Sequence, residues 1–153
     1  MDLEKLAEHS HQFSQRIYYE DTDFSGAIYH SAYLKFFERG RTEWLRQLNI
    51  QHYQLFDRGY AFMVSNIQVD FVSSAEMDEI IYIETNVGKI TPARIFFIQE
   101  IRRTLTLANI SEAKKDLIAS AKVTVCAVSK KNNVFMPVRL SQVLVTENVR
   151  INK

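Results

Sequence analysis

Cysteine, proline and glycine are scarce in this chain, which has one, two and four of them among its 153 residues. A single cysteine, Cys126, excludes an intrachain disulfide and any zinc site made of several cysteines. The uninterrupted apolar runs span only a few residues, far fewer than the roughly 20 that cross a bilayer. The first residues, Met-Asp-Leu-Glu, lack the basic patch that opens a secretory signal. We therefore expect a cytoplasmic protein without membrane insertion.

Charge of one sign is also lacking, because 19 Lys and Arg face 18 Asp and Glu. A formal net charge of +1 provides no global field that would hold nucleic acid, so we expect no nucleic-acid partner. Hydrophobic residues, in contrast, make up 46% of the chain, which predicts a compact fold. The length is typical of one domain, residues 1–153, preceded by a polar lead-in at residues 1–12 that we expect to be mobile or loosely docked.

The periodicity of the apolar residues predicts a helix within a set of strands. Alternation predicts a first strand over residues 13–19, and a loop rich in acids and hydroxyls follows at residues 20–26. Aromatic and aliphatic residues then recur at helical spacing from Tyr29 to Leu48, with Gly40 in the middle. Gly40 costs about 1 kcal/mol relative to Ala in a helix, so we expect a surface packed closely beneath it. Four further strands are predicted at residues 62–71, 80–90, 94–107 and 117–130, which together describe an α+β fold.

Two acids and a histidine lie where the loop meets the helix. The first amides of a helix lack intrahelical acceptors and can bind the oxyanion that develops when a thioester carbonyl is attacked. Asp23, ionised at neutral pH, could attack a thioester or deprotonate a water, and His30 lies seven residues further on. The alternative is that Asp21 or Asp23 only caps the helix or closes an Asx turn.

The same segment carries a family pattern. Tyr19-Glu-Asp-Thr-Asp23, Gly26, Tyr29-His30 and then Tyr33, Phe37-Glu38, Arg41 and Trp44-Leu45 resemble the YbgC-type acyl-CoA thioesterases of the 4-hydroxybenzoyl-CoA thioesterase family. This resemblance implies a hotdog fold, in which a curved antiparallel sheet wraps a long helix, and an assembly of dimers that often pair into tetramers. It also implies active sites at the subunit interface.

The resemblance assigns roles to three residues. Asp23 matches the catalytic aspartate, and His30 matches a position whose backbone amide and side chain both act on the thioester. Tyr19 matches a tyrosine of the YbgC branch. The 4-hydroxybenzoyl-specific branch has another residue at the position of His30, which favours a short-chain or broad acyl specificity. Hydrolysis of acyl-CoA to a free acid and coenzyme A is therefore the expected function.

Other functions remain open on sequence grounds. A hotdog acyl-thioester hydratase or dehydratase would use a similar histidine and acid, and a non-enzymatic acyl-CoA-binding protein would need neither. We expect no cofactor, and no metal because the remaining histidines lack metal-ligand spacing. Basic residues at strand ends are candidates for the phosphates of coenzyme A, without being assigned to the site: Lys89, Arg94, Lys130 and Lys131.

Overall fold

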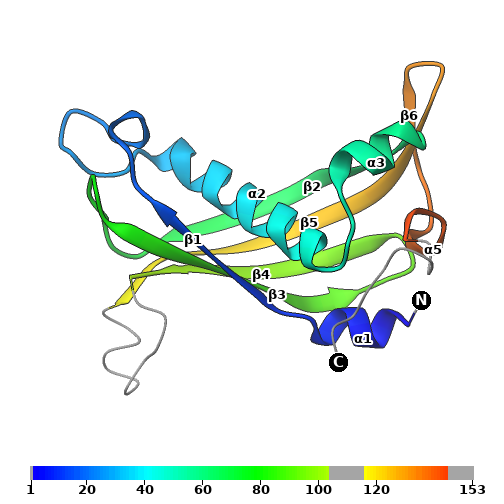
Figure 1. The fold of residues 1–153 in the computed structure, drawn as a ribbon, viewed down its shortest axis with the longest axis horizontal. Helices are drawn as coiled ribbons and strands as arrows, with labels where there is room; N and C mark the ends of the chain where they lie inside the picture. Colours follow the sequence, from blue (N-terminus) through cyan, green and yellow to red (C-terminus); the bar gives the residue numbers. More distant parts are fainter. Residues whose placement is uncertain (1, 104–115, 145–153) are drawn as a thin grey trace.

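An antiparallel sheet of six strands forms the body of the protein in a computed structural model that describes residues 2–103 and 116–144. Five strands follow the order β1-β3-β4-β5-β2, and β6 pairs with β5. Their bounds are β1 His11–Arg16, β2 Tyr60–Phe71, β3 Ile80–Ile90, β4 Arg94–Arg102, β5 Leu117–Lys131 and β6 Val134–Pro137. The sheet curves beneath a long helix (Figure 1).

The long helix, α2 (His30–Gln47), buries one face against the sheet. Trp44 of this face is fully buried and packs edge-on against Phe97 of β4, with ring centroids 5.1 Å apart. A Cβ added to Gly40 would lie 2.6 Å from Cγ2 of Ile83, so the helix backbone approaches the sheet more closely there than any other residue would permit. The predicted α+β arrangement of helix and wrapped sheet, and the predicted close surface beneath Gly40, are confirmed.

The start of the chain differs from the loosely docked lead-in that its polar composition indicates. Residues Leu3–Glu8 form a short helix, α1, which begins where the carboxylate of Asp2 accepts the N–H of Glu4 at 3.0 Å. Leu6 is fully buried, and the carbonyl of His9 accepts the indole N–H of Trp44 at 2.9 Å. Two leucines in six residues, Leu3 and Leu6, are too weak a pattern to predict a docked helix.

The first strand ends at Arg16, three residues before the predicted end. The chain then forms a 3-10 turn, η1 (Tyr19–Asp21). The carboxylate of Asp21 accepts the N–H of Tyr18 in this turn, so this amide is bound locally and not by a neighbouring strand. Besides α1 and η1, three further elements of the described residues were not predicted, namely the helices α3 (His52–Asp57) and α5 (Leu140–Val143) and strand β6. The predicted end of the fourth strand, at residue 107, lies outside the described residues.

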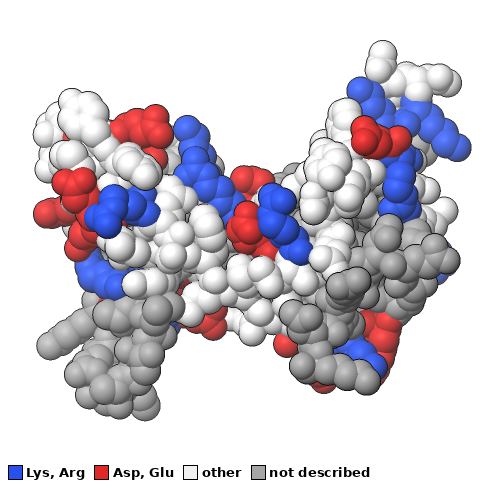
Figure 2. Space-filling model, viewed as in Figure 1, with Lys and Arg blue, Asp and Glu red and all other residues white. Residues whose placement is uncertain are grey.

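The surface carries both signs of charge. Figure 2 shows acidic and basic side chains interspersed on the face that it displays, in keeping with the net charge of +1. Among the residues that the structure describes, no helix combines the length and apolar character needed to cross a membrane.

Candidate active site

The loop before α2 is held by the backbone and by the side chain of Asp21. This carboxylate is buried, and its Oδ2 accepts the N–H of Tyr18 at 2.9 Å. The carbonyl of Asp21 accepts the N–H of Tyr29 at 3.2 Å, which ties the loop to the residue that precedes the helix. Gly26 adopts a φ of +82°, in the left-handed region that favours glycine, where the loop turns back. Asp21 is therefore a structural residue of this loop.

Asp23, in contrast, is fully exposed on the same loop. Its Oδ1 accepts the backbone N–H of Ser25 at 2.8 Å and the hydroxyl of Ser25 at 2.5 Å. These hydrogen bonds are the main cause of a pKa of Asp23 below its ordinary value, and the charge of His30 lowers the pKa further. The carboxylate is ionised at neutral pH, and the Asx turn predicted as an alternative is present without consuming Oδ2. Asp23 does not cap α2, since the residue before the helix is Tyr29.

His30 is the first residue of α2, and its exposed ring packs on Phe71 at the end of β2, with centroids 4.6 Å apart. The side chain of Tyr29, which precedes the helix, makes no capping hydrogen bond, so amides of the first turn that lack an intrahelical acceptor can meet an incoming oxygen. His30 lies in the wall of a hollow of about 260 Å³. The other lining residues are Ile28, Tyr33, Phe71, Val72, Ser73 and Ser74.

Tyr19 lies outside this hollow. It belongs to η1 rather than to the predicted strand, and its side chain is 80% exposed. Asp23 is also absent from the wall of the hollow, and its link to the hollow is the electrostatic interaction with His30. The structure thus places Asp23 within electrostatic range of His30 at the start of α2, and places neither Asp23 nor Tyr19 in the wall of the hollow.

Sequence reasoning missed the floor of the hollow. Phe71 and Ser73 come from the end of β2 and the loop after it, about forty residues from His30 in the sequence. The hydroxyl of Ser73 donates to the carbonyl of Leu117 at 2.8 Å and accepts from Nη1 of Arg103 at 3.2 Å. Besides His30, Tyr33 had a local signal, because it lies three residues further along the same helix face. Burial is the main cause that raises the pKa of Tyr33.

The described residues contain no group of three or more potential metal ligands. The carboxylate of Asp23, the imidazole of His30 and the first amides of α2 are groups that can attack an activated carbonyl and stabilise its oxyanion.

Residues 18–144 match the sequence profile of the thioesterase-like superfamily. The chain belongs to this superfamily. It is 35% identical over 127 residues to the acyl-CoA thioesterase YbgC of Haemophilus influenzae, an alignment that covers 82% of this chain and 93% of that protein. These two findings confirm the family predicted from the segment around Asp23 and His30.

Solved structures agree with this membership. A probable thioesterase from Bartonella henselae is 31% identical, with a TM-score of 0.70 over 87% of this chain and 99% of its own. The 4-hydroxybenzoyl CoA thioesterase from Pseudomonas sp. strain CBS-3 is only 16% identical, with a TM-score of 0.74 over 86% and 94% of the two chains, and so shows the fold alone. The hotdog fold predicted for this thioesterase-like chain is confirmed.

Proposed function

We propose that the chain hydrolyses acyl-CoA thioesters to a free acid and coenzyme A. The observation that carries the proposal is the ionised carboxylate of Asp23, which interacts electrostatically with His30 at the uncapped start of α2. A base or nucleophile and a set of oxyanion donors are thus held by neighbouring parts of one loop and one helix. The Haemophilus influenzae relative is an acyl-CoA thioesterase, which supports the same reaction.

The chemistry needs few groups. The thioester carbonyl oxygen accepts an amide hydrogen from the first turn of α2, where the helix dipole also stabilises developing negative charge. Asp23 either attacks the carbonyl carbon to form an acyl-enzyme anhydride, which water then cleaves, or takes a proton from a water that attacks directly. In both routes the carbon–sulfur bond breaks, the thiolate of coenzyme A leaves and accepts a proton, and the acid is released.

His30 and Tyr19 complete the proposed catalytic set. The imidazole of His30 lies in the wall of the hollow, where it can donate a hydrogen bond to the developing oxyanion or protonate the leaving thiolate. Tyr19 is 80% exposed in the isolated chain, so a catalytic role for its hydroxyl requires that substrate or a second subunit cover it.

A homodimer would supply this cover. Strand β2 ends the sheet, so its outer edge has no partner strand among the described residues. Several large apolar side chains on and just after this strand are 36–50% exposed, namely Met63, Val64, Ile67, Phe71 and Val72. An unpaired apolar edge of this length is a surface that proteins cover, and pairing of two β2 edges around a two-fold axis would cover it in both copies.

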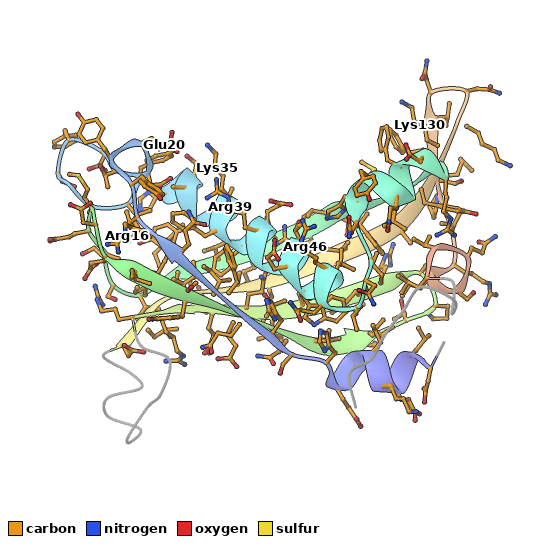
Figure 3. All side chains as sticks on the ribbon, viewed as in Figure 1. Arg16, Glu20, Lys35, Arg39, Arg46 and Lys130 are labelled. Atoms are coloured by element: carbon orange, nitrogen blue, oxygen red, sulfur yellow. The ribbon has the colours of Figure 1, made fainter. Side chains whose placement is uncertain are left out.

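Pairing would also bring distant basic residues to the site. Figure 3 shows Glu20, on the loop of Asp23, and Lys130, near the end of β5, at opposite ends of the molecule. Lys130 therefore lies away from the loop of its own chain, whereas a second copy rotated about β2 would bring its Lys130 end nearer to that loop. A tetramer of two such dimers, a cytoplasmic location and a short-chain or broad acyl specificity stay predictions.

Hydrolysis is tested by release of free coenzyme A from a panel of acyl-CoAs, from short aliphatic to aromatic, followed with a chromogenic thiol reagent. Release of thiol supports the thioesterase and separates it from a hydratase, which leaves the thioester intact. Absence of thiol release over the whole panel would refute the proposal. Light scattering tests the assembly, because a monomeric mass at micromolar concentration would contradict the homodimer.

A further inference from the structure

A second hollow, of about 80 Å³, lies between the C-terminal half of α2, the start of α3 and the inner face of the sheet. Its walls are mainly apolar and are built by Leu45, Phe62, Val64, Ile95, Phe97 and Val125. Four polar side chains line the remainder, namely Glu38, Arg41, Thr42 and His52. None of these ten residues belongs to the proposed catalytic set. We call this hollow the Arg41 cavity.

Arg41 is an unusual residue for such a wall. It is 8% exposed, and its only hydrogen bond to a described residue runs from Nη1 to Oε1 of Gln99 at 2.9 Å. Burial is the main cause that lowers its pKa, to about 10, so the guanidinium remains charged at neutral pH. None of the carboxylates in the described part of the chain forms an ion pair with it. The remaining N–H groups of the guanidinium have no acceptor among the described residues but are not fully enclosed, so an acceptor on a ligand in the cavity can meet them.

Gln99 holds Arg41 in place. Its Nε2 donates to the carbonyl of Phe37 at 2.9 Å and to the hydroxyl of Thr85 at 2.8 Å, so its carbonyl oxygen is left to accept from Arg41. All three contacts lie where Gly40 brings the helix against the sheet. The guanidinium is thus positioned by buried neutral groups, and none of these groups neutralises its positive charge.

The donor and acceptor roles of the other polar residues in the cavity follow from the hydrogens that each of them carries. The hydroxyl of Thr42 lies 2.7 Å from Oε1 of Glu38 and 3.1 Å from Nε2 of His52. Its single hydrogen goes to the carboxylate, which can only accept, so His52 must be the donor to Thr42. Partial burial lowers the pKa of His52, which keeps the ring neutral at neutral pH. The cavity therefore presents one cation and one anion, Arg41 and Glu38.

This balance selects the ligand. A bound carboxylate would meet Arg41 but would add a second negative charge beside Glu38, whereas a hydroxyl can accept from the guanidinium and donate to an acceptor without changing the net charge. We infer that the Arg41 cavity binds the far end of the substrate acyl group and selects acyl groups that end in a hydroxyl. This inference rests on the proposed thioesterase function and adds its substrate class.

The reach of the acyl group depends on the subunit that provides the cavity. Within one chain, His30 and Arg41 are eleven residues apart on α2, or about 17 Å at 1.5 Å per residue. If two β2 strands pair along their full length around a two-fold axis, Phe62 opposes the partner's Val69, two residues or about 7 Å from the partner's Phe71. The cavity of one subunit then lies near the catalytic loop of the other, at a distance that a medium-length acyl chain can span.

The test compares three six-carbon substrates that differ only at the far end, hexanoyl-CoA, 6-hydroxyhexanoyl-CoA and adipoyl-CoA, by kcat/KM from thiol release. A hydrogen bond to a charged group discriminates by about tenfold or more, so we expect the hydroxylated substrate to exceed hexanoyl-CoA by that factor. Arg41→Met should bring this ratio close to one. Arg39→Met is the matched control, because Arg39 stacks over Phe36, 5.9 Å from its ring centroid, and does not line the cavity.

Glu38→Gln provides a second measurement that does not disturb a buried residue. Removing the anion leaves Arg41 as the single charge, so the ratio of adipoyl-CoA to 6-hydroxyhexanoyl-CoA should rise about tenfold or more. Equal rates for hexanoyl-CoA and 6-hydroxyhexanoyl-CoA would overturn the inference while leaving the thioesterase in place. A wild-type preference for adipoyl-CoA, or a ratio unchanged by Glu38→Gln, would also overturn it. Absence of thiol release from all three would remove the thioesterase itself.

Discussion

Replacement of Asp23 by asparagine separates chemistry from folding more cleanly than any other change in this site. The carboxylate is fully exposed, and its Oδ1 accepts both hydrogen bonds from Ser25. Asparagine retains an Oδ1 acceptor of nearly the same shape, so both bonds can persist and the Asx turn is kept. Because Asp23 caps no helix and is buried by no neighbour, we expect the melting temperature to stay near that of the wild type.

Activity should respond very differently. Asparagine is neither a nucleophile nor a base, and a positioned base contributes roughly 10²–10⁴-fold to a rate. We therefore expect kcat for acyl-CoA hydrolysis, measured by thiol release, to fall by two orders of magnitude or more. The reasoning would be refuted by an Asp23→Asn protein with near-normal turnover, since Asp23 would then be only a turn residue.

Asp21→Asn is the matched control two residues away. Asp21 is buried, and its Oδ2 accepts the N–H of Tyr18, so this change acts on the loop rather than on the reaction. We expect a lower melting temperature and a much smaller loss of turnover than for Asp23→Asn. A reversal of the two effects would exchange the roles of the two aspartates.

Four further changes probe the site, the core and the assembly. His30→Ala should lower kcat more than it raises KM, because a side chain beside the oxyanion acts mostly in the transition state; unchanged kcat would leave only the backbone amide of this residue in the reaction. Gly40→Ala should lower the free energy of unfolding by up to about 2 kcal/mol in urea titrations, as overpacking against Ile83 outweighs a gain of about 1 kcal/mol in helix propensity; an equal or higher stability would show that the sheet yields. Burial lowers the pKa of His9 below its unfolded value of 6.5, so folding is not penalised by this residue above pH 6.5. Stability is lost as the pH falls from 6.5 through the folded-state pKa, because the unfolded chain then binds the proton more readily. His9→Gln should flatten this decline of the melting temperature at acid pH, and an unchanged slope would contradict the reasoning. Ile67→Lys, on the exposed edge of β2, should give a monomer by light scattering with reduced thiol release, whereas an unchanged mass would exclude this edge as the interface.

The sequence by itself predicted the long helix, five of the six strands in the described residues and the acid-rich loop that leads into the helix. Helical spacing from Tyr29 to Leu48 and alternation in the strands are repeated over many residues, and each repeat reports the same buried face. The close approach at Gly40 could be predicted because a glycine in a helix interior needs a compensating contact. Asp23 and His30 could be predicted as neighbours because a loop and the helix that it enters are adjacent in the chain; their catalytic roles stay predictions.

Only the tertiary structure decided what depends on contacts between distant segments. It separated buried Asp21 from exposed Asp23, although both lie in the same four-residue stretch, because burial is set by elements that the loop contacts and not by its own residues. It placed Phe71 beneath His30 and joined Arg41 to Gln99, 58 residues apart. The sheet order β1-β3-β4-β5-β2 decides which strands meet and which edge stays open, and strand pairing of this kind leaves no trace in a local pattern.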